Sequence, residues 1–323
     1  IQMSYYFMFV ILFFVGAYFE DAYKKKELPH FFKASGVLAL AAVVGVCINI
    51  SNLYHTYEYS KETMRGKSEL KQEGAAASQT SSGLDRDYIT NWSYGIGETL
   101  TLLVPNVKGG GSGSTMSQSE AAMAKANPMY NGIYSQLPQY FGEQPWTAGP
   151  VYVGAFVMFL FVLGCFIVKG PLKWALLGAT IFSILLSWGK NFMGLTDFFI
   201  DYVPMYNKFR AVSSILVIAE FTIPLLAIFA LKEILSKPDM LKQEKNCRGV
   251  IAALVLTAGV ALILAVAPGT FFSSFITAQE MTALKQALPA EHLAPFVANL
   301  TEMREAIIAS DAWRSFFIIV IGC

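Results

Sequence analysis

Six long apolar stretches constrain this chain more than any other feature. They cover residues 3–19, 34–50, 151–168, 172–188, 211–231 and 250–267, and a seventh begins near Trp313. A helix needs about 20 apolar residues, and at least about 17, to cross a bilayer core. Lipid offers the backbone no hydrogen-bonding partner, so such segments must be helices. The sequence therefore predicts an all-α fold, a polytopic transmembrane helical bundle with long extracytoplasmic loops.

Composition supports the same class. Hydrophobic residues make up 54% of the chain and charged residues only 15%, whereas soluble domains have about 25% charged residues. The formal net charge of +1 gives no reason to expect a nucleic-acid partner. The four cysteines and three histidines show no metal-site spacing. We therefore expect membrane lipids as partners, and no metal site is indicated by these residues.

The basic residues of the short turns predict the orientation. Lys24 to Lys26, Lys169 and Lys173, and the run from Lys232 to Arg248 fall on one face if the spans alternate strictly, and lysine-rich turns stay cytoplasmic. We expect two helices in 1–50, a long extracytoplasmic loop in 51–150, four helices in 151–267, an extracytoplasmic segment in 268–312 and the start of a truncated helix in 313–323. Within the long loop, the Gly/Ser-rich stretches 74–83 and 109–119 should be flexible. We also expect the chain to be a fragment of a longer protein.

A short amphipathic segment precedes the fifth span. Phe192, Leu195, Phe199 and Tyr202 recur at spacings of three or four, which predicts a helix lying on the membrane surface. A plain connector between spans is the alternative.

The densest cluster of charges is Asp197, Asp201, Lys208 and Arg210, at the mouth of the fifth span. Asp197 and Asp201 repel each other at i, i+4 unless a cation or a basic partner intervenes. Lys208 and Arg210 beside a helix start suit a phosphate group. Ordinary anchoring at the membrane boundary is the alternative for both.

Glu220 lies within the fifth span, where an ionisable residue usually has a function or a partner. In a transporter, Glu220 would serve as a proton relay. The alternative is a structural role, in which Glu220 forms a hydrogen bond with the backbone freed by Pro224.

The long loop contains a second polar group. Asp85, Asp87, Trp92, Tyr94 and Glu98 combine carboxylates with aromatic rings, as on a surface that contacts a sugar or an acceptor. The alternative is a solvated loop.

Several runs of sequence together resemble the YfhO-like family of bacterial membrane proteins. They are KKKELPHFFKA, NLYHTYEYSKETMRGKSEL, WSYGIGETLTLLVPN, GEQPWTAGPVYVG and LLSWGKNFMGLTDFFIDYVPMYNKFRAVSSILV, of which PMYNKFRAVSS, residues 204–214, is the most distinctive. The resemblance covers most of the chain outside its Gly/Ser-rich insert.

The resemblance implies a glycosyltransferase of the GT-C type in the bacterial cytoplasmic membrane. Such an enzyme takes sugar from a polyprenyl-phosphate donor and transfers it to an envelope glycan or lipid acceptor. In such enzymes the catalytic carboxylate usually follows the first span, so we expect it upstream of this chain. Lys208 and Arg210 would hold the donor phosphate. No cofactor is implied, apart from a divalent cation that the paired carboxylates would accept.

Two other classes remain open from the sequence. A lipid or solute transporter would depend on Glu220, and a non-catalytic envelope assembly protein would need none of these residues for chemistry.

Overall fold

The computed structural model describes residues 2–63 and 83–323, and it is all-α within them, with one isolated bridge between Thr115 and Pro138 in place of a sheet. Four helical stretches in the described chain are long and apolar enough to span a membrane: Gln2–Lys25, Leu28–Ile48, Val212–Ser236 and Glu244–Val266. The prediction of an all-α, multi-pass membrane protein is confirmed. The expected flexible stretch 74–83 lies outside the described residues, except for Gly83.

The chain folds as two compact units. Unit 1 comprises Ile1–Ser93 and Lys169–Ala219, and unit 2 comprises Tyr94–Val168 and Glu220–Cys323. The expected long loop is therefore divided between the units at Ser93 and Tyr94.

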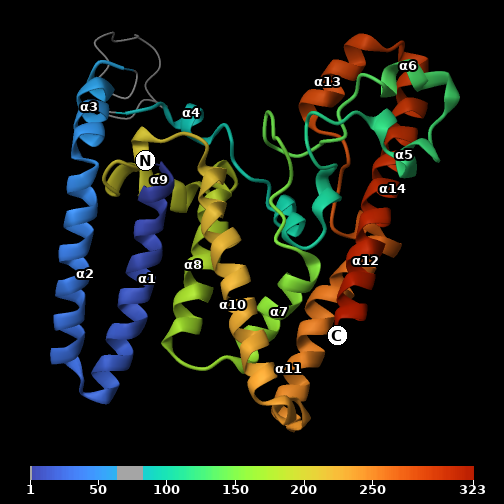
Figure 1. Cartoon of the computed structure of the whole chain (residues 1–323). Helices are drawn as coiled ribbons and strands as arrows, with labels where there is room; N and C mark the ends of the chain where they lie inside the picture. The colour runs from blue at the N-terminus through green and yellow to red at the C-terminus, as the bar shows by residue number, and fades with distance from the viewer. Residues whose placement is uncertain (1, 64–82) are drawn as a thin grey trace. The chain divides into compact units, whose positions relative to one another are not determined.

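Unit 1 is built on two antiparallel helices, α1 (Gln2–Lys25) and α8 (Pro171–Ser187) (Figure 1). Phe182 of α8 contacts both Phe9 and Phe13 of α1, with ring centroids 5.3 and 5.5 Å apart, and Gly178 lies against the Phe13 ring. This pairing brings the end of α1, with Lys24 and Lys25, to the start of α8. The helices of the unit are α1 (Gln2–Lys25), α2 (Leu28–Ile48), α3 (Ile50–Lys61), α4 (Arg86–Thr90), α8 (Pro171–Ser187) and α9 (Met193–Tyr202).

Helix α9 does not continue the direction of α8. The two parts of the pair Pro171–Ser187 and Gly189–Tyr202 are bent by 109°. A short helix was predicted here and is present, but the face that it buries in the protein differs from the expectation. Phe199 is buried in the core, whereas Phe198 is 53% exposed.

Unit 2 combines apolar helices with a lobe of short segments, which is formed by residues 94–154. Its helices are α5 (Glu120–Met123), α6 (Asn131–Tyr134), α7 (Ala155–Ile167), α10 (Val217–Ser236, whose first turn belongs to unit 1), α11 (Glu244–Leu254), α12 (Val260–Val266), α13 (Ala278–Ala287) and α14 (Ala290–Gly322). Arg304 of α14 is fully buried and binds Glu280 of α13 through two hydrogen bonds of 2.6 and 2.7 Å. This pair fixes α13 to α14.

The third expected span is shorter than predicted. Only Ala155–Ile167, 13 residues, is helical, because Gly154 before it has a φ of +100° that a helix cannot contain. At 1.5 Å per residue this helix is about 20 Å long, which is less than the roughly 30 Å of a bilayer core. Its close contact with α10 places Gly164 against Leu226 and Ala230.

Helix α14 runs without a break from Ala290 to Gly322, so most of the expected extracytoplasmic segment 268–312 and the expected start of a span at residue 313 share one helix. Charged residues of this helix are satisfied within unit 2. Arg304 binds Glu280, and Asp311 accepts hydrogen bonds from the Asn106 N–H at 2.9 Å and from Arg314.

The expected flexible stretch 109–119 is also wrong, because it is an ordered segment. Met116 is fully buried, its N–H donates to the Leu137 carbonyl at 2.9 Å, and the Gln139 N–H donates to Ser114 at 2.7 Å. Gly109 has a φ of +82°, so here glycine permits a left-handed turn rather than flexibility.

Two glycines of this segment provide a matched test. A methyl group at position 109 would lie 1.8 Å from the Gln139 carbonyl oxygen, whereas one at Gly113 would meet nothing within 4 Å. We expect Gly109→Ala to lower the midpoint of thermal unfolding strongly and to reduce the yield of folded protein. Gly113→Ala should leave both unchanged. Equal behaviour of the two variants would show that the segment is a flexible linker after all.

The orientation is tested with two exposed positions of unit 2, in a variant whose other native cysteines are replaced. Cys247 is exposed in the first turn of α11, within the basic segment 232–248, and Met129 lies in the lobe, 65% exposed. An impermeant thiol reagent added to intact cells should label Met129→Cys and not Cys247, because the basic turn stays cytoplasmic. The reverse pattern would overturn the orientation.

Candidate functional site

The paired carboxylates of α9 have a positive partner from the long loop. The guanidinium of Arg86, the first residue of α4, donates from Nη1 to Asp197 and from Nη2 to Oδ1 of Asp201, the latter at 2.6 Å. The basic partner expected from the i, i+4 repulsion is therefore Arg86. Within the described residues, no group of three or more His, Cys, Asp or Glu side chains could hold a metal ion. The carboxylates fasten α4 to α9 instead.

The segment between α9 and α10 has an unusual backbone. Met205 and Ala211 have φ values of +66° and +61°, a region that non-glycine residues occupy only at a cost. The Leu84 N–H donates to the Asn207 carbonyl at 2.9 Å, so a hydrogen bond joins the loop before α4 to this segment. The distinctive run of residues 204–214 thus contains two strained positions, which are common at functional sites.

Arg210 lies on two aromatic rings. Its Nη1 donates to the Tyr88 hydroxyl at 2.8 Å, and the centre of the guanidinium is 5.9 Å from the Tyr88 ring and 5.7 Å from the Trp92 ring. The residue is exposed. Its other N–H groups are therefore available to a ligand.

The expected help from a helix N-terminus is smaller than predicted. Arg210 precedes a 3-10 turn, Val212–Leu216, and α10 begins only at Val217. The Ser213 N–H in that turn donates to the Trp92 carbonyl at 3.2 Å. That backbone donor is therefore occupied by the protein.

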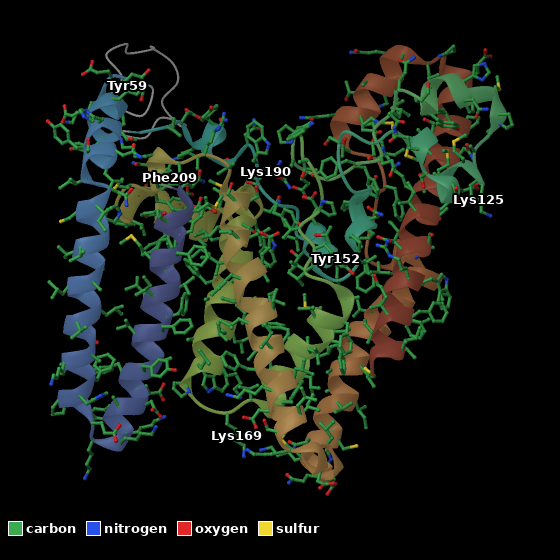
Figure 2. All side chains as sticks on the ribbon, viewed as in Figure 1. Tyr59, Lys125, Tyr152, Lys169, Lys190 and Phe209 are labelled. Carbon is green, nitrogen blue, oxygen red and sulfur yellow. The ribbon has the colours of Figure 1, made fainter. Side chains whose placement is uncertain are left out.

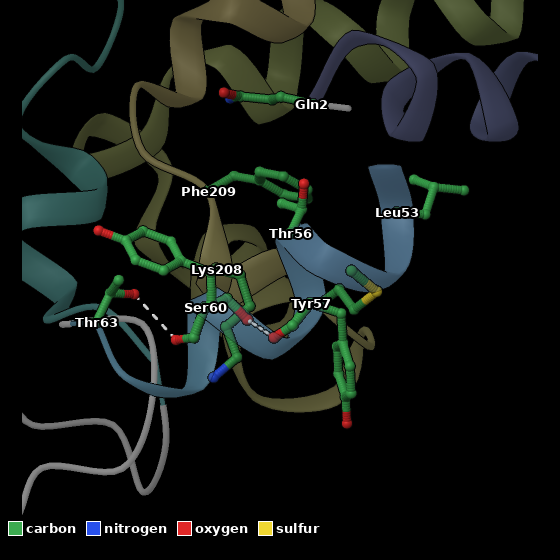
Figure 3. A pocket seen from close by; sticks show the side chains of 10 residues that line it. Gln2, Leu53, Thr56, Tyr57, Ser60, Thr63, Lys208 and Phe209 are labelled. Carbon is green, nitrogen blue, oxygen red and sulfur yellow. Dashed lines mark hydrogen bonds between the residues drawn. The ribbon is translucent and has the colours of Figure 1, made fainter. Parts of the chain in front are cut away.

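A pocket of about 360 Å³ opens beside this segment, between α3, the start of α1 and residues 205–209. This volume lies within the range of small-molecule sites. Figure 3 shows side chains from α3, such as Tyr57 and Ser60, together with Lys208 and Phe209 from the segment before α10. The described residues that line the pocket are Gln2, Leu53, Thr56, Tyr57, Tyr59, Ser60, Thr63, Met205, Lys208 and Phe209.

Lys208 carries the only charge among those lining residues. Partial burial lowers the pKa of its ammonium group. An anionic ligand would offset that burial, because the opposite charge favours the protonated amine. The hydroxyl protons of Ser60 and Thr63 already donate to the Tyr57 and Ser60 carbonyls, at 2.7 and 2.9 Å. The pocket thus suits an amphiphile with an apolar body and an anionic head.

Lys208 and Arg210 are neighbours, but the structure does not put both side chains into the pocket. Arg210 is absent from its lining, and only its backbone reaches the site, where Nε2 of Gln2 donates to the Arg210 carbonyl at 2.8 Å. Figure 2 labels two residues that line the pocket, Tyr59 on α3 and Phe209 in the segment before α10.

The loop residues predicted to contact a sugar do not form one exposed surface. In unit 2, Tyr94 is 3% exposed and Glu98 is 2% exposed. Glu98 accepts hydrogen bonds from the Gly95 N–H at 2.6 Å and from the Tyr140 hydroxyl at 2.5 Å, and burial raises the pKa of its carboxyl group. The prediction of sugar contacts by Tyr94 and Glu98 is wrong, because both hold the lobe together.

In unit 1, the other three loop residues have separate places. Asp85 caps α4 by accepting the Asp87 N–H at 2.9 Å, and the ring of Trp92 lies under Arg210. Asp87 remains exposed. Of the three, Asp87 alone keeps a carboxylate directed to solvent.

Glu220 lies in the first turn of α10 and is exposed. A carboxylate in a first turn is stabilised by the helix dipole. Glu220 is the ninth of the 25 residues of the candidate span Val212–Ser236, between the start of that span and its middle.

Comparison of the chain with protein-family models, with curated proteins and with solved structures finds no match.

The bridge from Arg86 to α9 can be measured by a mutant cycle. The side chain of Arg86 is 23% exposed, and those of Asp197 and Asp201 are 43% and 44% exposed. Partly exposed pairs contribute little individually, so we expect a coupling of about 1 kcal/mol between Arg86→Ala and the Asp197→Asn, Asp201→Asn double variant. Thermal unfolding of the purified protein gives this value. The control pair Arg248 and Glu244, with side chains 77% and 81% exposed, should show no coupling. Additive effects at Arg86 would contradict the bridge.

Proposed function

We propose that this chain belongs to a membrane glycosyltransferase that transfers a sugar from a polyprenyl-phosphate donor to an envelope glycan or lipid, on the outer side of the bacterial cytoplasmic membrane. The observation that carries the proposal is the pocket beside residues 205–209, which joins apolar walls to the Lys208 ammonium at the start of α1, a helix long and apolar enough to span a membrane. The resemblance of residues 204–214 to the YfhO-like family supports the same function.

The chemistry of the donor explains why such a pocket is needed. Nucleotide sugars are not supplied outside the cytoplasmic membrane, so a transferase there requires a sugar carried by a lipid. The phosphate of that lipid must lie at the bilayer surface while its hydrocarbon chain stays in apolar surroundings. Lys208 would hold the phosphate and stabilise the negative charge that grows on it as the sugar leaves.

Arg210 would act beside the pocket rather than inside it. Its guanidinium rests on Tyr88 and Trp92 and keeps exposed N–H groups, while Gln2 ties its backbone to the pocket wall. In this proposal it contacts the outer part of the bound head group. The catalytic carboxylate is not assigned to any residue of this chain.

A transporter is the weaker proposal. It would depend on Glu220, which lies in the first turn of α10 and is not one of the residues that line the pocket. A non-catalytic assembly protein would bind lipid without turnover, which the following experiment detects.

The test is donor turnover by Lys208 variants of the purified full-length protein supplied with polyprenyl-phosphate sugars. Loss of a charged hydrogen bond costs about 1.5 to 3 kcal/mol, so Lys208→Gln should lower kcat/KM about 10- to 100-fold, and Lys208→Arg should keep most activity. Lys33→Gln, an exposed lysine of α2, is the matched control and should be unchanged. Turnover by Lys208→Gln equal to the control would reject the phosphate role. Absence of turnover with every donor would reject the transferase.

A further inference from the structure

Helix α9 lies across the direction of the spans in unit 1. The bend of 109° separates it from α8, and α8 packs along the membrane-spanning α1 through the ring contacts of Phe182 with Phe9 and Phe13. A helix nearly perpendicular to a span runs in the plane of the membrane. Figure 1 shows α9 at the end of α1 and α8 opposite the turn between α1 and α2. It is therefore placed at the depth of the bilayer surface.

The two faces of α9 are unlike each other. Thr196, Phe199 and Ile200 are buried in the core of unit 1. Phe198 and Tyr202, four residues apart, are 53% and 75% exposed, and their ring centroids are 5.4 Å apart. The outward face thus presents a pair of packed aromatic rings.

The acidic edge of α9 is partly neutralised. Asp197 and Asp201 flank the aromatic face, and both bind the guanidinium of Arg86. Two free carboxylates would be repelled by anionic head groups and would favour water. The single positive charge of Arg86 offsets one of the two negative charges, and this weakens the repulsion from a lipid surface.

We infer that the aromatic face of α9 binds the boundary between head groups and acyl chains of the bilayer. Phenylalanine and tyrosine favour this depth, and an in-plane helix with one apolar face buries that face there. The spans of unit 1 also expose apolar side chains, since α2 has no buried residue and Leu12 of α1 is 64% exposed. The occupant is the membrane in which the chain is embedded, and the inference does not depend on sugar transfer.

Spin labels at single cysteines test this placement in lipid vesicles. In a background with Cys47, Cys165, Cys247 and Cys323 replaced, labels are placed at Phe198→Cys and Tyr202→Cys. Leu12→Cys serves as the reference for lipid. Asp87→Cys, at an exposed position of α4, serves as the reference for water. Collision rates with oxygen, which concentrates in lipid, and with a water-soluble nickel complex are then compared.

We expect both α9 labels to collide readily with oxygen and weakly with nickel, at a depth shallower than that of Leu12→Cys. Collision rates equal to those of Asp87→Cys would show that the face is in water. Low collision rates with both reagents would show that a second copy or another protein covers it. Either result would overturn the inference, and thermal unfolding of each variant shows whether the fold is kept.

Discussion

Lipid cannot hydrogen-bond to a peptide group, and this constraint governs the whole chain. It makes every spanning segment helical, and charged side chains need partners within the protein. Arg86, at the start of α4, binds Asp197 and Asp201 of α9 in unit 1, and Arg304, in the middle of α14, binds Glu280 of α13 in unit 2. In each unit an arginine and its carboxylate partners thus join two helices.

The spans were predictable where length and hydrophobicity were both clear. Residues 3–19, 34–50, 211–231 and 250–267 all lie largely within helices that could cross a membrane. The failures have local causes. Gly154 shortens α7 through its positive φ, which composition does not reveal. Phe199 was placed on the face toward the membrane surface because a helical pattern shows that apolar residues cluster, but not whether protein or lipid covers them.

The candidate site was predicted only in part. Lys208, Arg210, Asp197 and Asp201 stood out as charges beside a span, but Arg86 is 111 residues away from Asp197, and no local pattern joins them. The α3 wall of the pocket was missed for the same reason. Glu98 was misread because a carboxylate among loop residues usually faces water, whereas here Gly95 and Tyr140 satisfy it inside the lobe. Contacts distant in sequence decide each case.

The central claim is that the pocket beside Lys208 holds a lipid phosphate. A structure of the purified protein determined with polyprenyl phosphate tests it most directly. The account predicts phosphate oxygens about 3 Å from Nζ of Lys208, with the hydrocarbon chain leaving along Met205 and Phe209. Phosphate bound elsewhere, with the pocket empty or filled by hydrocarbon alone, would contradict it.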